Sequence, residues 1–400
     1  MKWSRRKRAG MAAPEPGIAR HNVTTLGVVA LFSGAAQEMI YPLLPAFVVV
    51  ALGGSKTILG VVEGSLVAAV ALSRLGSGWA LHRGARAKKL TVGFYATSLV
   101  ARPLLALAPS IVWVSALRVA DGIGKGGKDA PRDSLVAAAA GSRTGRAFGI
   151  QRMLDTSGSV IGPLLAAAVL LVIGHSEHSL RVVFALAAIP GIAALLSLRR
   201  VVDTTPPPPD RTAKPQPLPP AFYGLLGAVF LFGLANSSDT LLLLRAQTAG
   251  VSIVLLPVLY AAFNLVYAAM AVPAGSLADR VGKRPLLIAA WIIYAAAYIG
   301  FAYADRAWQI WLLFLLYGLY YASAEGTAKA FVASVVPEDR RGWAYGLYAT
   351  ASGLLVLPAG VIAGSLWDRY GPTPPFLFGG VVAALAALLL AVVEIRSRRH

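Results

Sequence analysis

The feature that most constrains this chain is a series of apolar runs, each 18 residues or longer, that recurs from one end of the sequence to the other. A helix of about 20 residues crosses a hydrocarbon core roughly 30 Å thick. Charged residues make up only 14% of the sequence, whereas they are roughly a quarter of a soluble protein. The sequence has no alternating segments of strand length, so helices are predicted rather than barrel strands. The chain is therefore predicted to be an all-α membrane protein.

Twelve transmembrane helices are predicted. Their approximate limits are 23–50, 57–81, 90–108, 111–139, 147–173, 180–198, 222–245, 252–278, 286–304, 308–333, 343–367 and 374–394.

The basic residues of the tails and connections are distributed unevenly. One side of the predicted membrane holds 24 of them and the other holds five, namely Lys56, Arg181, Arg245, Arg306 and Arg369. Because cytoplasmic segments are enriched in Lys and Arg, the tails 1–22 and 395–400 are predicted to be cytoplasmic. The formal net charge of +19 does not indicate a nucleic-acid partner, because the basic residues lie in short clusters between apolar runs rather than on one soluble face.

A proline-rich stretch interrupts the series of apolar runs after span six. Residues 199–221 include Pro206–Pro209 and further separated prolines. Such a composition favours an extended, semi-rigid spacer over a packed core. The chain is therefore predicted to consist of two six-helix bundles, 23–198 and 222–394, joined by a cytoplasmic linker.

Two connections at equivalent places in the two halves carry the same pattern. A glycine is followed, after three residues, by a polar residue, an arginine, a second glycine and more basic residues. Self-similarity of this kind indicates a duplicated fold. The first copy contains Gly78, His82 and Arg83, the second contains Gly275, Asp279 and Arg280, and a third after span eleven runs Gly364-Ser-Leu-Trp-Asp368-Arg369.

With these loops, the chain resembles the major facilitator superfamily over nearly its whole length. The loop Gly275–Arg284 is similar to the signature between spans two and three, Arg118-x-x-x-Gly122-x-Gly124 to a span-four motif, and Gly158-x-x-x-Gly162-Pro163 to a span-five motif of exporters. Residues Gly122–Asp133 resemble a bacterial subgroup of unassigned substrate. The resemblance implies two pseudo-symmetric bundles, a central cavity between spans 1, 4, 7 and 10, and transport by rocking of the halves. We expect a monomer in a bacterial cytoplasmic membrane.

The first loop departs from the family pattern, since His82 stands where the second copy has Asp279. The resemblance implies that this acid binds a helix N-terminus through a charge–dipole interaction, a contact that we call a latch. The functional interpretation of His82 is a weakened or pH-sensitive latch. The alternative is an exposed loop histidine without a role.

Span four carries charged residues at steps of three and four, which place them within an arc of about 140° on one helix face. Such a stripe cannot face lipid, so it faces water, a cavity or other helices. The structural interpretation, ion pairs that hold the helix, suits the residues near the interface. Asp121 and Asp129 lie deeper and are candidates for a proton or substrate site. The stripe comprises Arg118, Asp121, Lys125, Lys128, Asp129, Arg132 and Asp133.

Span ten, the repeat equivalent of span four, carries its own polar stripe. Each of the four helices expected to line the cavity contains a carboxylate, and Glu325 is the preferred proton carrier because Lys329 lies one turn away. Spans one and seven contribute Gln37 and Glu38, and Asn236, Ser237, Ser238 and Asp239. The candidate substrate- or proton-binding residues are Glu38, Asp121, Asp129, Asp239, Glu325, Lys329, Tyr317, Tyr321, Asn236 and Arg118.

Four further charged residues within spans are predicted to form ion pairs between or along helices. They are Glu63 and Arg74 in span two, and Arg152 with Asp155 in span five.

The energy for transport is expected to come from an ion gradient, because the sequence contains no phosphate-binding Gly-xxxx-Gly-Lys-Ser/Thr loop. All five histidines lie in predicted tails or loops and there is no cysteine, so neither an intramembrane enzyme nor a metal or other cofactor is expected. The predicted function is a proton-coupled antiporter that exports a small amphipathic or cationic compound. A proton-coupled carrier of an organic anion and a lipid flippase of the same fold are the alternatives.

Overall fold

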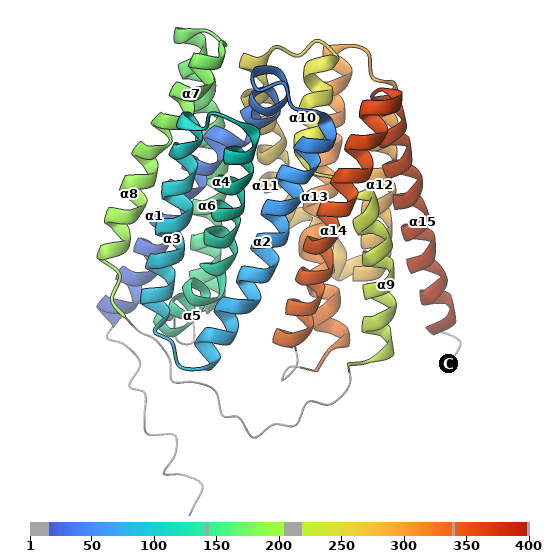
Figure 1. Cartoon of the computed structure of the whole chain (residues 1–400). Coiled ribbons are helices and arrows are strands. Elements are labelled where there is room, and N and C mark those ends of the chain that lie inside the picture. Colours follow the sequence, from blue (N-terminus) through green and yellow to red (C-terminus); the bar gives the residue numbers. More distant parts are fainter. Residues whose placement is uncertain (1–15, 141–143, 204–217, 338–340, 398–400) are drawn as a thin grey trace, which may run out of the picture.

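The computed structural model describes residues 16–140, 144–203, 218–337 and 341–397, and over these ranges the chain is a bundle of helices without strands (Figure 1). Most of the predicted tails and of the proline-rich linker lies outside the described residues. The first half contains α1 (Pro16–Ile40), η1 (Tyr41–Leu43), η2 (Ala46–Ala51), α2 (Lys56–His82), α3 (Ala87–Leu104), η3 (Leu105–Leu107), α4 (Ile111–Gly127), α5 (Asp129–Ala140), α6 (Thr144–Ile173), α7 (Glu177–Leu186) and α8 (Ala188–Arg199). The second contains α9 (Pro220–Ala235), α10 (Asp239–Thr248), η5 (Ile253–Leu255), α11 (Leu256–Val281), α12 (Lys283–Tyr303), α13 (Ala307–Val335), α14 (Arg341–Tyr370) and α15 (Thr373–Ser397).

Ten helices of the described chain are long and apolar enough to cross a membrane, and they match ten of the twelve predicted spans. The other two predicted spans, 111–139 and 308–333, are also helical, in α4–α5 and α13. These are the two spans that carry the predicted polar stripes, which lowers their hydropathy. The prediction of an all-α protein with twelve spans is confirmed.

Three of the spans are divided where a proline removes a backbone donor. Pro131 has no N–H for the carbonyl of Gly127, and α4 gives way to α5 at Lys128. Pro190 stands in the same relation to the boundary between α7 and α8. In span one, Pro42 lies in the 3₁₀ segment η1 that ends α1. The breaks are therefore encoded locally, by the position of each proline.

The packing of helices in the first half recurs in the second. Spans 1 and 5, 2 and 4, 3 and 4, 3 and 6, and 1 and 6 are in contact as α1–α6, α2–α4, α3–α4, α3–α8 and α1–α8. Adding six to each span number gives α9–α14, α11–α13, α12–α13, α12–α15 and α9–α15, which are also in contact. The two halves are thus pseudo-symmetric six-helix bundles, as predicted.

The seam between the halves consists mainly of α2 against α14 and α6 against α11. These are the contacts of span 2 with span 11 and of span 5 with span 8, and the pseudo-two-fold rotation maps each contact onto the other. At the α2–α14 contact, Gly60 and Gly360 meet backbone to backbone, since a Cβ on Gly60 would lie 2.2 Å from the Gly360 carbonyl oxygen. Only glycine permits this approach.

The two ends of the bundle differ in what they carry. Figure 1 shows that α1 begins and α15 ends at the same end of the molecule, where the connection between α2 and α3 also lies. We call this end the terminal face and the opposite end, where α7 begins, the distal face. Arg284 at the start of α12 lies over the ring of Phe331 near the end of α13, 4.9 Å from its centroid. The second repeat loop therefore lies close to the end of α13, which Figure 1 places at the terminal face.

Candidate functional site

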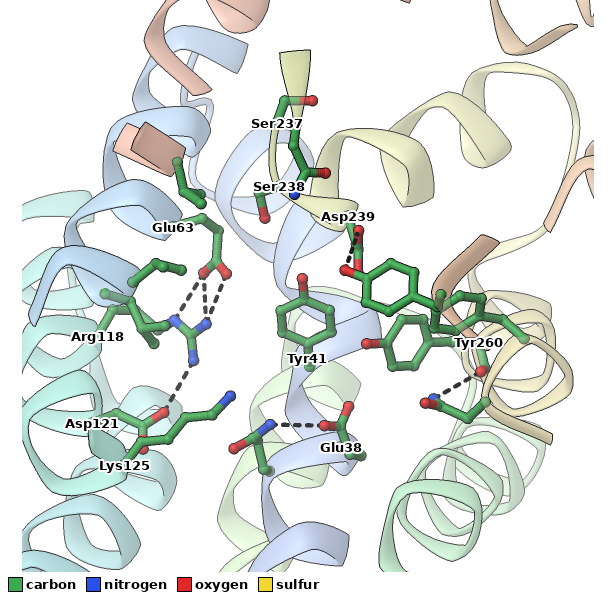
Figure 2. A pocket seen from close by; sticks show the side chains of 18 of the residues that line it. Glu38, Tyr41, Glu63, Arg118, Asp121, Lys125, Ser237, Ser238, Asp239 and Tyr260 are labelled. Atoms are coloured by element: carbon green, nitrogen blue, oxygen red, sulfur yellow. Dashed lines mark hydrogen bonds and ion pairs between the residues drawn. The ribbon is translucent and has the colours of Figure 1, made fainter. Parts of the chain in front are cut away.

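A cavity of about 330 Å³ lies between the two halves, near the middle of the bundle. Figure 2 shows Arg118, Asp121 and Lys125 on one side of it and Asp239 and Tyr260 on the other, with Tyr41 and Glu38 between them. The lining residues come from the four spans expected around a central cavity and from α2, α11 and α14. They are Gln37, Glu38, Tyr41, Glu63, Leu66, Val67, Arg118, Asp121, Lys125, Asn236, Ser237, Ser238, Asp239, Tyr260, Phe263, Asn264, Tyr267, Tyr321, Glu325 and Val356.

On the wall of the first half, Arg118 of α4 is held by two carboxylates. Its Nε and Nη2 donate to Glu63 Oε1 at 2.9 and 2.7 Å, and Nη2 also donates to Oε2 at 2.9 Å. Its Nη1 lies 3.2 Å from Asp121 Oδ2. Arg118 is 3% exposed and Glu63 1%, so neither ion is hydrated and each is compensated by the other. Glu63 therefore pairs with span four, whereas Arg74 of the same helix pairs with Asp129.

Arg102 of α3 continues this network toward α1. Its Nε donates to Asp121 Oδ1 at 2.9 Å, its Nη1 to the Ser33 carbonyl at 2.9 Å, and its Nη2 to Gln37 Oε1 at 3.1 Å. The Ser98 hydroxyl also donates to Asp121. With two arginines and a hydroxyl around it, Asp121 is a fully engaged partner within the first half. The geometry supports its structural interpretation over a role as proton carrier.

Glu38 ends the network, and one of its oxygens is left over. Gln37 Nε2 donates to Glu38 Oε1 at 2.7 Å, whereas Oε2 is buried without a hydrogen-bond partner among the described residues. Glu38 is 7% exposed and forms no ion pair within the described part of the chain. A buried carboxylate oxygen without a donor is costly unless a ligand or a proton reaches it.

On the wall of the second half, Asp239 stands where span seven is interrupted between α9 and α10. Tyr317 donates to Asp239 Oδ1 at 2.7 Å, and Tyr321 lies 3.2 Å from Oδ2. Helix α9 ends at this break, and the carbonyl oxygen of its last residue, Ala235, accepts a hydrogen bond from the Tyr294 hydroxyl at 2.9 Å. Asp239 forms no ion pair within the described ranges. Two tyrosines of span ten thus orient a carboxylate of span seven, although Tyr321 lines the cavity and Tyr317 is not among its lining residues.

Aromatic side chains surround this half of the site. Tyr317 lies 5.6 Å from Phe263 and 5.3 Å from Tyr321, centroid to centroid, and Tyr294 stacks on Tyr298 at 4.1 Å. The second half thus supports its cavity wall with rings, whereas the first half supports its wall with ion pairs. The two walls therefore differ in their side chains, although the backbones of the two halves are related by pseudo-symmetry.

Glu325, the preferred proton carrier, connects the two halves. Its Oε2 accepts from Tyr267 at 2.5 Å and lies 3.5 Å from Arg152 Nη2 of α6, and Lys329 donates to its Oε1 at 2.8 Å. Arg152 also lies 4.0 Å from Asp155 and donates to the Tyr267 hydroxyl at 2.5 Å. Glu325 is 37% exposed and Arg152 56%. This geometry describes a solvated link between the halves, with Lys329 outside the cavity lining.

Asp129, another candidate, does not line the cavity. It lies at the start of α5 and pairs with Arg74 of α2 at 2.5 Å and with Arg132 at 3.5 Å. Arg132 also binds Asp133 at 2.9 Å. These contacts support the structural interpretation for Asp129 as well as for Arg132 and Asp133.

The repeat-loop residues also lie away from the cavity. His82, Asp279 and Arg280 are exposed, and the Arg83 guanidinium lies over the Trp79 ring at 4.0 Å. A Cβ on Gly78 or Gly275 would meet no atom within 4 Å. Asp279 makes no hydrogen bond with the residues that the structure describes, so the predicted latch is not seen at this loop.

Sequence reasoning missed several residues that shape the site. Arg102 is a lone arginine before Pro103 and follows no polar periodicity, although an arginine in the middle of an apolar run is itself a signal. Tyr41, Tyr260 and Phe263 look like ordinary apolar-span residues. The structure offers no group of three or more metal-ligating side chains in its described ranges.

Comparisons with known proteins agree with this fold. The family model described as Major Facilitator Superfamily matches residues 26–356 and 225–399. An uncharacterized MFS-type transporter of Methanocaldococcus jannaschii is 32% identical over 383 residues, covering 93% of this chain and 94% of that protein. A multi-drug resistance efflux pump PmrA homolog of Lactococcus lactis is 35% identical over 117 residues, 29% of this chain and 28% of that protein. The crystal structure of a mutant form of the nucleoside transporter NupG superposes with a TM-score of 0.79 at 12% identity, covering 93% of this chain and 99% of that one.

The match to the family model spans both halves, and the similarity to the archaeal protein runs over nearly the whole of each chain. Twelve spans, pseudo-symmetric bundles and a polar cavity at the seam are the architecture that this family uses for solute transport. The chain belongs to the Major Facilitator Superfamily and is an integral membrane transporter.

Proposed function

We propose that this transporter is a proton-coupled antiporter that exports a small amphipathic or cationic compound by alternating access. The observation that carries the proposal is the pair Glu38 and Asp239. These carboxylates come from different halves, line one cavity, and have no cationic partner within the described chain. A proton or a cationic compound can compensate each of them, and competition between the two is what antiport requires.

The form of the cavity supports a small solute. Seven of its 20 lining residues carry ionisable acidic or basic groups, which suits a polar solute better than a lipid chain. Tyr41, Tyr260 and Phe263 add ring faces on which an organic cation can stack. The partial similarity to a multi-drug efflux pump agrees with export of such compounds.

The direction of transport depends on topology. We propose that the terminal face is cytoplasmic, because the basic residues of the first two repeat loops, between α2 and α3 and between α11 and α12, lie there. A rocking motion about the seam then exposes the cavity first to one side of the membrane and then to the other. Glu325 and Arg152 would separate and rejoin during this motion.

The test uses proteoliposomes that contain the purified protein and ethidium as the cationic probe. An opposing proton gradient should accelerate ethidium transport in the wild type. Glu38→Gln and Asp239→Asn should each slow gradient-driven transport about tenfold or more, which corresponds to roughly 1.4 kcal/mol. Glu177→Gln serves as the matched control, because Glu177 pairs with Arg181 outside the cavity. Wild-type transport that ignores the proton gradient, or full coupling in both variants, would refute the assignment.

A further inference from the structure

Lys125 is a cation in the cavity wall without a close anionic partner. It lies on α4 one turn beyond Asp121, and in Figure 2 its side chain extends from that helix toward the middle of the cavity. It makes neither a hydrogen bond nor an ion pair within 4.0 Å among the residues that the structure describes. Asp121 is already engaged by Arg102 and Arg118, so it is not available to compensate the ammonium.

The other charged residues of the cavity lining are either compensated by a neighbour or left without an ionic partner. Arg118 and Glu63 compensate each other, and Asp121 is shared by two arginines. Glu325 pairs with Lys329 and Arg152. Glu38 and Asp239 remain as the unpaired acids and Lys125 as the unpaired base of the described lining. An unpaired buried or half-buried charge is costly, so each of the three is a point where a ligand of opposite charge gains binding energy.

These charges lie on opposite walls. Figure 2 shows Lys125 on the side of the first half and Asp239 across the cavity, beside Tyr260. The side-chain oxygen Oδ1 of Asn236 is also buried without a hydrogen-bond partner in the described structure and can accept from an ammonium near Asp239. One wall is thus prepared for an anionic group and the other for a cationic one.

Building on the proposed function, we infer that the transported compound is a small zwitterion. Its carboxylate binds Lys125, its ammonium binds Asp239 and Asn236, and its apolar part packs on Tyr41, Tyr260 and Phe263. Glu38 is then left for the proton. The cavity of about 330 Å³ lies at the lower end of the range of ligand pockets and suits a compound of amino-acid size.

The experiment uses sets of ligands that share one apolar part and differ in whether they carry an ammonium, a carboxylate or both. Phenylalanine, phenethylamine and 3-phenylpropionate share one ring, as do tryptophan, tryptamine and 3-indolepropionate, and leucine, isoamylamine and 4-methylvalerate share one branched chain. Binding to the purified full chain is measured by thermal stabilisation, since a ligand that binds the native state raises the melting temperature. In at least one set, the zwitterion should bind about tenfold or more tightly than the amine and the acid.

The variants assign the two ends. Lys125→Met should lower affinity for the zwitterion about tenfold and leave affinity for the amine unchanged, and Lys125→Arg should restore much of the loss. Asp239→Asn should instead reduce binding of the zwitterion and the amine but not of the acid. Lys89→Gln, which changes an exposed lysine in the first turn of α3, is the control. If Lys125→Met fails to fold, Lys125→Gln removes the same charge with a polar side chain and should show the same loss of affinity for the zwitterion.

Each outcome decides the inference separately from the proposed function. A zwitterion preference that survives Lys125→Met unchanged, or no binding in any of the three sets, overturns the zwitterion assignment even if ethidium transport is coupled to protons. A preference that depends on Lys125 supports it even if the proton gradient has no effect.

Discussion

Asp368 at the end of α14 caps Thr57 at the start of α2, and so joins the two halves at the distal face. Its carboxylate accepts from the backbone N–H groups of Lys56 and Thr57 at 3.1 and 2.8 Å and from the Thr57 hydroxyl at 2.6 Å. A carboxylate at a helix N-terminus satisfies free donors and interacts favourably with the helix dipole. Asp368 belongs to the third copy of the repeat loop. An acid-to-helix contact of the kind that the family pattern implies at Asp279 is therefore present at Asp368, in the third copy and on the other face.

Loss of this cap should loosen the distal face. Asp368→Ala removes a helix cap, an interaction worth about 0.5–2 kcal/mol, and the value here lies toward the lower end because the carboxylate is partly exposed. A cysteine at Ser365, which lies 3.4 Å from the Thr57 hydroxyl, should then be alkylated several-fold faster. Asp305→Asn, an exposed acid elsewhere, is the control. Equal labelling rates in wild type and Asp368→Ala would show that the cap does not hold the halves together.

The link between Arg152 and Glu325 should affect transport more than stability. Both side chains are more than a third exposed, and such pairs contribute about 0–1 kcal/mol. Arg152→Gln and Glu325→Gln should therefore melt within a few degrees of wild type but change the rate of transport. The charge-reversed pair Arg152→Glu with Glu325→Arg should recover part of that rate. If Glu325 is instead the proton carrier, the reversed pair will not restore coupling to the pH gradient.

Asp121 and Glu38 should separate structural from functional carboxylates. Asp121→Asn leaves Arg102 and Arg118 underpaired in a buried site, and breaking a buried ion pair costs about 3–5 kcal/mol. The expected result is poor expression or a much lower melting temperature. Glu38→Gln breaks no ion pair and should remain folded while losing coupling. Similar melting curves for the two variants would contradict this division.

The glycine contact at the seam should not accept a methyl group. A Cβ on Gly60 would lie 2.2 Å from the backbone oxygen of Gly360, so Gly60→Ala must push α2 and α14 apart. Overpacking of this kind costs about 1–3 kcal/mol and should also slow transport. Gly227→Ala in α9, where the added carbon meets no atom within 4 Å, is the matched control. Thermal melting and ethidium transport of both variants provide the measurement.

Topology can be tested directly, because the chain contains no cysteine. Single cysteines at Lys56 and His178, at the starts of α2 and α7, should react with a membrane-impermeant maleimide added outside intact cells. A cysteine at Arg83 should react only after the membrane is opened. The reverse pattern would place the terminal face outside and reverse the proposed direction of export.

Local signals in the sequence predicted the fold, whereas the partners of the charged residues required the structure. The prolines at 131 and 190 mark helix breaks that follow from a missing N–H group. The polar periodicity of span ten predicted a stripe that includes Tyr317 and Tyr321, but their contact with Asp239 is seen only in the structure. The partner of Glu63 could not be deduced, because Arg74 lies about three turns away on the same helix and the sequence does not show which other helix brings an arginine close. Arg102 was missed because it belongs to no repeating pattern.

The chemical difference between the two cavity walls has a consequence for compounds that only partly resemble the cargo. The spare base, Lys125, belongs to the first half, whereas Asp239 and most of the rings belong to the second. A compound with a single charged end would occupy one wall and make few contacts with the other. Since binding promotes a conformational change only through contacts that differ between the two states, such a compound should be carried more slowly than the cargo and should compete with it for the cavity.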